Sequence, residues 1–222
     1  MRIAILGGTG DIGEGLALRW AFHTDHEIVI GSRERDRAVT KAEEYETELS
    51  SRGVDVTIEG LENPDAAATA DVVVAAVPAY HLVDTIESVT ESLTAGTVLV
   101  SPAVGMRRDE AGMHYNRPGA GSVTALAADA TPEDVPVVGG FHNLAAGRLA
   151  NLDADLSMDV LLVGEDDDAR ETVAALTDAI DGLRALEAGP IDNAAEVESL
   201  TPLLINLAEY NDGLHDVGVR FE

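Results

Sequence analysis

A glycine-rich stretch near the start of the chain constrains the fold more than any other feature. It reads Gly8-x-Gly10-x-x-Gly13, and it lies between the apolar segment Arg2–Leu6, a predicted buried strand, and Ile12–Phe22, whose apolar side chains recur at helical spacing. A strand, such a turn and a helix in this order form the dinucleotide-binding fingerprint: the glycines allow a tight turn, a close approach to the pyrophosphate, and close packing of helix on strand. The helix N-terminus adds N–H groups for the anion. We therefore expect the whole loop to bind a dinucleotide, through Gly8, Thr9, Gly10, Asp11, Ile12 and Gly13; a purely structural turn is the alternative.

Predicted strands and helices alternate along the rest of the chain. Strands such as Val72–Val77 are apolar throughout, as expected when helices cover both faces of a parallel sheet. This pattern predicts a doubly wound α/β fold of Rossmann type. The predicted strands are Arg2–Leu6, Glu27–Ile30, Val54–Ile58, Val72–Val77, Thr97–Val100, Val135–Val138, Asp159–Val163 and Leu183–Glu187, and the predicted helices are Ile12–Phe22, Asp36–Ser51, Tyr80–Leu93, Leu144–Leu149 and Asp167–Ile180.

The alternation breaks between Ala103 and Gly121, where Gly, Arg and Met follow no clear period. We interpret this stretch as a functional loop. Because the pattern restarts after it, we place a domain boundary near residue 141. The prediction is a dinucleotide-binding domain over residues 1–141 and a smaller C-terminal α/β lobe over residues 142–222.

A final helix is predicted near the C-terminus. Asn193, with Glu196 three residues later, resembles a capping box that opens this helix. Pro202 lies inside its apolar stripe. It either kinks the helix or restarts it, with Thr201 as the cap and Pro202 at the first helical position.

The end of the second predicted strand selects between the two nicotinamide dinucleotides. An NAD site usually carries Asp or Glu there, about 20 residues past the glycines, to bind the ribose 2′-hydroxyl. This chain has Gly31, Ser32 and Arg33 instead, and a hydroxyl with a guanidinium suits a 2′-phosphate. Arg33, Arg35, Arg37 and Lys41 place four of the 14 basic residues within nine positions. We expect NADP(H), bound through Ser32, Arg33 and Arg37; the alternative is a solvated helix whose arginines pair with neighbouring carboxylates.

Charge and composition exclude several function classes. The 222 residues carry 41 Asp and Glu against 14 Lys and Arg, a net charge of −27, which repels nucleic-acid phosphates. There is no Cys, and the six His form no HxxxH or HxH pair, so we expect no metal site. No apolar run is long enough for a membrane span, and we expect a cytoplasmic protein. Thirteen of the 14 basic residues are Arg, and an acidic, Lys-poor surface fits a cytosol of molar salt, which screens repulsion between carboxylates.

Several segments together resemble the archaeal NADPH-dependent coenzyme F420 reductases, also called F420H2:NADP oxidoreductases. They are RIAILGGTGDIGEGLALR and EIVIGSR in the N-terminal part, RLANLD at Arg148–Asp153, and IDGLRALEAGP and VESLTPLLINLAEYN in the C-terminal part. The resemblance runs from Arg2 to Phe221 and implies a homodimer that passes a hydride between C4 of NADP(H) and C5 of the 5-deazaflavin ring. It also implies that His142 and Leu144 lie where the two rings stack. The family pattern there often reads His-Thr-Ile-Pro, whereas this chain has His-Asn-Leu-Ala.

Two further groups of residues are candidates for ligand contacts, with a purely structural or solvent-exposed role as the alternative. Pro78 and His81 follow the strand Val72–Val77, at the carboxyl end that faces the ligand in such sheets, and we expect them to contact the nicotinamide. The alternative is that Pro78 only ends the strand and that His81 is a surface residue. Basic residues in the irregular loop meet the deazaflavin tail or are solvated. These are Arg107, Arg108 and Arg117, while Met106 and Met113 are interpreted as packing residues.

Two other functions compete with F420 reduction. An NADP-dependent reductase of another small substrate needs a proton donor in its cleft, and the single Lys, Lys41, lies instead at the predicted phosphate site. A non-catalytic NADP(H) sensor would bind cofactor without turnover and expose an apolar patch for its partner.

Overall fold

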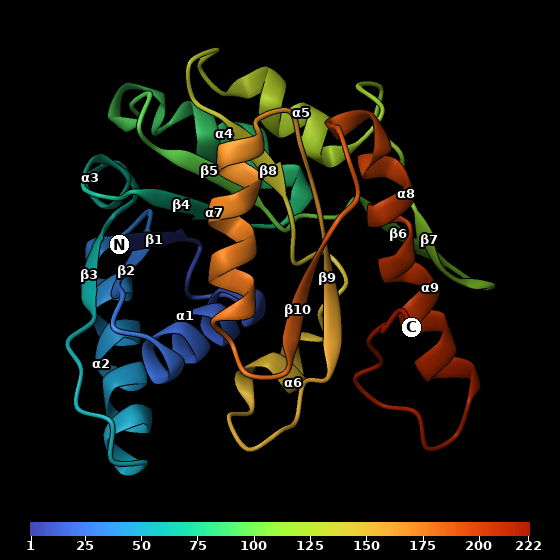
Figure 1. The fold of residues 1–222 in the computed structure, drawn as a ribbon, viewed down its shortest axis with the longest axis horizontal. Coiled ribbons are helices and arrows are strands. Elements are labelled where there is room, and N and C mark those ends of the chain that lie inside the picture. Colours follow the sequence, from blue (N-terminus) through green and yellow to red (C-terminus); the bar gives the residue numbers. More distant parts are fainter.

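The computed structural model describes residues 1–222 and contains one eight-stranded sheet with helices on both sides (Figure 1). The strand order is β10-β9-β8-β5-β4-β1-β2-β3. The strands of this sheet are β1 (Arg2–Leu6), β2 (Glu27–Ser32), β3 (Glu59–Glu62), β4 (Val72–Ala75), β5 (Val98–Ser101), β8 (Val137–Gly139), β9 (Met158–Gly164) and β10 (Leu183–Glu187). The α-helices are α1 (Asp11–His23), α2 (Arg35–Ser51), α3 (Asn63–Ala68), α4 (Ala79–Glu87), α5 (Val123–Ala130), α6 (Ala146–Ala150), α7 (Asp167–Asp178), α8 (Ala194–Glu198) and α9 (Leu200–Tyr210).

Both faces of the sheet are buried, which explains the continuous apolar strands. In β1, Ile3 and Ile5 belong to the core under α1, α2 and α7, whereas Ala4 and Leu6 belong to the core under α3, α4 and α5. Successive side chains of a strand point to opposite faces, so a strand covered on both sides must be apolar at every position. The predicted doubly wound α/β fold is confirmed.

The sheet is mixed rather than wholly parallel. Six consecutive strands of the sheet, from β3 to β8 in the strand order, pair parallel with one another. β8 then pairs antiparallel with β9, where Val138 lies opposite Gly164. β9 and β10 are then parallel to each other. The strands of residues 142–222 therefore extend the same sheet, and the division into two domains at residue 141 stays a prediction.

The stretch predicted as an irregular loop contains regular structure. It contains an antiparallel hairpin of β6 (Met106–Asp109) and β7 (Gly112–Tyr115), in which Gly112, the first residue after the turn, has φ 116°. Helix α5 follows directly, capped by the Ser122 hydroxyl, which accepts from Ala125 N at 2.9 Å. The hairpin escapes an analysis by burial pattern because β6 is exposed at every position.

Two other predicted elements are wrong in position. The segment Val54–Ile58, predicted as a strand, is irregular. The strand that pairs with β2 at the edge of the sheet is instead Glu59–Glu62, which has an exposed Glu at each end. The helix predicted to reach Leu93 ends at Glu87, and a short 3₁₀ turn, Thr90–Ser92, follows it.

The predicted C-terminal helix is two helices. α8 ends at Glu198 and α9 begins at Leu200, so the break precedes Pro202 by several residues and places this proline in the first turn of α9. Thr201 is not the cap, and Asn193 makes no capping bond; its side-chain amide donates instead to the Ala188 carbonyl at 2.8 Å. No helix combines the length and the apolar character that crossing a bilayer requires.

Candidate functional site

The glycine-rich loop links β1 to the N-terminus of α1 through a backbone that side chains would disturb. Gly7 has φ +72°, and a Cβ on Gly13 would lie 2.7 Å from Gly8 Cα. The second distance is shorter than real Cβ contacts, so Gly13 lets α1 start directly against the turn. No side chain caps the N-terminus of α1. Its first N–H groups therefore remain available to an anion, which is the requirement for binding a pyrophosphate.

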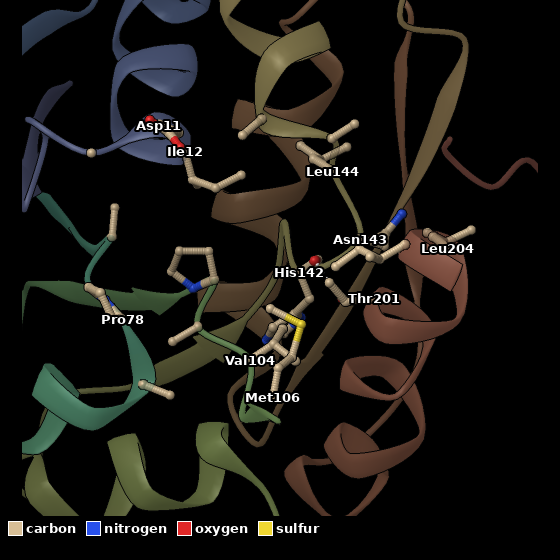
Figure 2. A pocket seen from close by; sticks show the side chains of 18 of the residues that line it. Asp11, Ile12, Pro78, Val104, Met106, His142, Asn143, Leu144, Thr201 and Leu204 are labelled. Atoms are coloured by element: carbon tan, nitrogen blue, oxygen red, sulfur yellow. Dashed lines mark hydrogen bonds between the residues drawn. The ribbon is translucent and has the colours of Figure 1, made fainter. Parts of the chain in front are cut away.

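A cavity of about 770 Å³ opens beside this loop, and we call it the apolar cavity (Figure 2). Most of its lining is hydrophobic, and Asp11, His142, Asn143, Thr201 and Asp216 are its polar members. It is built from separate parts of the chain: Gly10–Ile12, Ala76–Ala79, Pro102–Val104 with Met106, His142–Ala146, four residues of α9 (Thr201, Leu204, Ile205 and Ala208), and Asp216 with Val217 near the C-terminus. Its volume lies in the range of cavities that enclose small ligands.

His142 is held at the wall of this cavity by contacts at both its backbone and its ring. Its carbonyl accepts from Thr201 Oγ1 of α9 at 2.7 Å, and its Nε2 lies 3.4 Å from Thr124 Oγ1 of α5. The side chain is buried, and burial lowers the pKa of His142 to about 4. The ring is therefore neutral at physiological pH, and its Nδ1 has no partner within the protein.

The turn that delivers His142 is strained. Phe141, the preceding residue, is buried and has φ 65°, in the left-handed region that side chains other than glycine rarely adopt. Its ring packs edge-on against Trp20 of α1, with ring centroids 5.7 Å apart. A strained backbone of this kind costs about 1–3 kcal/mol and persists because the surrounding packing enforces it. The turn also places Leu144, which is buried, on the cavity wall.

A second cavity, of about 250 Å³, borders the glycine-rich loop at Thr9; we call it the cationic cavity. Its lining residues are Thr9, Asp36, Arg37, Thr40 and Lys41. Lys41 Nζ pairs with Glu44 at 2.6 Å, and this hydrogen bond raises the pKa of Lys41. Arg33, Arg35 and Arg37 make no ion pair, although the chain has far more carboxylates than cations. The three arginines therefore do not pair with neighbouring carboxylates, and Lys41 is the basic residue of this cluster that does.

The predicted site residues distribute over the two cavities and their surroundings. Gly10, Asp11, Ile12, Pro78, His142 and Leu144 line the apolar cavity, and Thr9 and Arg37 line the cationic cavity. Ser32, Arg33 and His81 line neither one. Ser32 is buried at the end of β2 with its hydroxyl 3.3 Å from Glu34 N, Arg33 is exposed, and His81 lies against the Tyr80 ring on the exposed side of α4. Their roles in binding stay predictions.

The arginines of the β6–β7 hairpin region also lie outside both cavities. Arg107 pairs with Asp109 at 2.9 Å, Arg108 pairs with Glu209 at 3.0 Å, and Arg117 donates to the Gly121 carbonyl. Met106, interpreted from sequence as a packing residue, lines the apolar cavity.

α9 and the C-terminal segment contribute to the apolar cavity, which the sequence pattern did not predict. Thr201, Leu204 and Ile205 line the cavity, but in sequence they form part of an ordinary apolar stripe. Asp216 and Val217 carry no pattern at all. The signal that could have pointed to this region is the family resemblance of the segment VESLTPLLINLAEYN.

Comparison with known proteins agrees with this geometry. The fold and the site define a Rossmann-type dinucleotide-binding protein, with an uncapped helix N-terminus between a cationic cavity and an apolar one. A family model described as NADP oxidoreductase, coenzyme F420-dependent, matches residues 2–105. The chain belongs to the family of F420-dependent NADP reductases, and the resemblance predicted from its sequence is confirmed.

Two archaeal relatives carry this assignment over nearly the whole chain. An F420-dependent NADP reductase of Methanocaldococcus jannaschii is 38% identical over 209 residues, 93% of this chain and 92% of that protein. One from Methanothermobacter thermautotrophicus is 37% identical over 226 residues, 99% of this chain and 94% of that protein. Two solved structures show similarity of the fold alone. A crystal structure from Arthrobacter sp. FB24 has a TM-score of 0.76 at 23% identity, over 94% of each chain. A pyrroline-5-carboxylate reductase from Coxiella burnetii has a TM-score of 0.60 at 18% identity, over 92% of this chain and 66% of that one.

Proposed function

We propose that this protein transfers a hydride reversibly between NADP(H) and the 5-deazaflavin coenzyme F420. The observation that carries the proposal is that two consecutive residues, Thr9 and Gly10, line two different cavities. One cavity is small and cationic and the other is large and apolar, which matches the phosphorylated end and the ring end of one dinucleotide bound across the glycine-rich loop. When bound, the two cofactors supply the chemistry, a hydride that passes between C4 of the nicotinamide and C5 of the deazaflavin.

The protein's own residues bind, orient and exclude water. The N–H groups of α1 fit the pyrophosphate, and Arg37 with Lys41 fits the 2′-phosphate, assisted by Ser32 and Arg33 at the end of β2. The apolar lining excludes water from the rings. His142 and Leu144 fit the role of ring contacts, since both are buried and fixed at the cavity wall.

The test is a mixing assay in molar KCl that follows the visible absorbance of oxidised F420 after addition of NADPH or NADH. We expect bleaching with NADPH and little with NADH. Arg37→Ala should raise KM for NADPH about 10- to 100-fold, because a hydrogen bond to a charged group contributes about 1.5–3 kcal/mol, and should leave KM for NADH nearly unchanged. Arg33→Ala should act in the same direction.

Arg35→Ala is the matched control for Arg37→Ala, because Arg35 also lies in α2 and is exposed and unpaired, but unlike Arg37 it does not line the cationic cavity. An equal effect of Arg37→Ala on both dinucleotides would contradict the 2′-phosphate assignment. Absence of bleaching, with NADPH binding measured in the same salt, would leave a reductase of another substrate or a sensor.

We also propose a homodimer. α9 exposes Leu203, Leu207 and Tyr210 to the extent of 52%, 39% and 64%, along one edge of the molecule (Figure 1). An apolar face of this kind is typical of an interaction surface, and a second copy of the chain is the occupant that the family resemblance implies. Analytical ultracentrifugation in molar KCl should give a dimer that the double variant Leu203→Glu, Leu207→Glu converts to monomer. A monomeric wild type would contradict the proposal.

A halophilic, cytoplasmic setting is the last part of the proposal. The net charge of −27 and the single Lys support it, because molar salt reduces the Debye length to about 3 Å and screens repulsion between carboxylates. The melting temperature should fall when KCl is lowered from molar to dilute. An unchanged melting temperature would argue against the halophilic interpretation, and fractionation of the source cells tests the location.

A further inference from the structure

Glu198 is a fully buried carboxylate that the function described so far does not use. It is the last residue of α8, and no Lys or Arg side chain pairs with it. Its two oxygens accept four hydrogen bonds instead: Oε2 from Tyr115 Oη (2.7 Å) and Val123 N (3.0 Å), and Oε1 from Thr124 N (2.8 Å) and Thr124 Oγ1 (2.9 Å). The two N–H groups are the first of α5, where the helix dipole also favours an anion. Both oxygens of Glu198 therefore act as acceptors toward all four partners.

This carboxylate determines what the Thr124 hydroxyl can do. A threonine hydroxyl has one proton, and here that proton is used in the bond to Glu198 Oε1. The Thr124 oxygen can then only accept from His142 Nε2, 3.4 Å away. A hydrogen bond between the two side chains then requires the His142 ring to carry its proton on Nε2. Burial, which lowers the pKa of His142, keeps the ring neutral, so that Nδ1 bears the lone pair.

The surrounding backbone accommodates the hydrogen bonds that link Glu198, Thr124 and His142. A Cβ on Gly139 of β8 would lie 2.7 Å from Thr124 Oγ1 and 2.8 Å from its methyl carbon, so the absence of a side chain at Gly139 makes room for Thr124. Thr201, three residues after Glu198, holds the His142 carbonyl at 2.7 Å. α8 and α9 thus fix the ring and the backbone of the same histidine.

We propose that Glu198 and Thr124 are positioning residues that hold His142 at the cavity wall in its Nε2–H form. Neither touches the reacting atoms; they act through His142, and the consequence for turnover rests on the proposed function. Without the Thr124 hydroxyl, Nε2 loses its partner, and nothing in the structure then favours Nε2–H over Nδ1–H, since neither ring nitrogen has another partner in the protein.

The test compares Thr124→Val with Thr124→Ser, and uses Tyr115→Phe as the matched control. Thr124→Val removes the hydroxyl but keeps the shape and the N–H that Glu198 accepts from. Thr124→Ser keeps the hydroxyl. Tyr115→Phe removes another hydroxyl from the same carboxylate without touching His142. Two-bond ¹H–¹⁵N correlation spectra of the imidazole identify which ring nitrogen carries the proton, and they need no turnover.

We expect the wild type, Thr124→Ser and Tyr115→Phe to show His142 as the Nε2–H form, and Thr124→Val to show a mixture with the Nδ1–H form. In the F420 assay, Thr124→Val should lower kcat about 3- to 10-fold, as for the loss of one neutral hydrogen bond, with KM for NADPH unchanged. A wild type protonated on Nδ1, a Thr124→Val protein that keeps only the Nε2–H form, or a failure of Thr124→Ser to restore kcat would overturn the proposal. If no variant, nor the wild type, reduces F420, the proposed function fails, while the spectra still decide the position of the proton.

Discussion

The cationic cavity and the apolar cavity share the glycine-rich loop but differ in how the chain builds them. The cationic cavity takes its residues from Thr9 and from one stretch of α2 between Asp36 and Lys41, and all five are polar or charged. The apolar cavity takes its residues from segments spread between Gly10 and Val217, and most are hydrophobic. A site for a phosphate needs a few charges close together, which a short segment can supply. A site for two rings needs enclosure, which only distant segments packed together can supply.

The apolar cavity contains a buried histidine, His142, and this predicts that acid lowers the stability of the fold. Between pH 6.5 and about 4 the unfolded chain binds a proton at His142 that the folded chain does not, so stability should fall as the pH is lowered through this window. At most the loss is about 3 kcal/mol, from a shift of roughly two and a half pKa units. His142→Gln should flatten the pH dependence of the free energy of unfolding in denaturant titrations. His215→Gln, at an exposed position, is the control, and equal slopes for wild type and His142→Gln would contradict the prediction.

Loss of the His142 ring should damage turnover but not dinucleotide binding. We expect His142→Ala to lower kcat about 100-fold, because a displacement of about 1 Å between reacting rings has effects of this size, while Kd for NADPH stays within a few-fold. Single-turnover kinetics and a fluorescence titration measure the two quantities. His26→Ala, just before β2 and at the opposite end of that strand from the site, should change neither. A large increase in Kd for NADPH would show that the apolar cavity also determines the affinity for the dinucleotide, and would contradict the prediction.

The shared loop offers a variant that should affect both cavities. Gly13→Ala would force Cβ to within 2.7 Å of Gly8 Cα, and overpacking of this kind costs about 1–3 kcal/mol. We expect a lower melting temperature and weaker NADPH binding. Gly10→Ala is the matched substitution, because its Cβ would lie 3.5 Å from the nearest atom, Gly7 O. It should weaken NADPH binding while leaving the melting temperature nearly unchanged, and equal melting temperatures for the two variants would contradict the steric argument.

The smallest effect should come from Lys41 in the cationic cavity. Because Lys41 already pairs with Glu44 at 2.6 Å, its contribution to a bound phosphate is shared with that carboxylate. We expect Lys41→Ala to raise KM for NADPH only a few-fold, less than Arg37→Ala, in the same steady-state assay. An increase larger than that of Arg37→Ala would mean that Lys41 exchanges partners when NADPH binds.

Most of the fold could be predicted because its signals are local. β1, β2, β4 and β5 are short apolar runs, and the glycine-rich turn between β1 and α1 has a conformation that few other residues permit. The errors fall where tertiary contacts override local pattern. Glu59–Glu62 forms a strand because the neighbouring β2 offers its edge, and the exposed β6 forms a strand because β7 pairs with it.

The sequence by itself determined the dinucleotide turn, the cluster of basic residues near the end of β2 and the family. Each depends on residues close together in the chain, and local sterics and charge act at that range. The tertiary structure decided which residues enclose the rings. Burial keeps the His142 ring neutral. Thr124, which bonds Glu198, contacts the ring, and Thr201 bonds the carbonyl; these residues are distant in sequence and meet only because α5, α8 and α9 pack at the end of β8. Burial and hydrogen-bond partners are properties of the folded chain, and for that reason the sequence could name His142 but not describe what holds it.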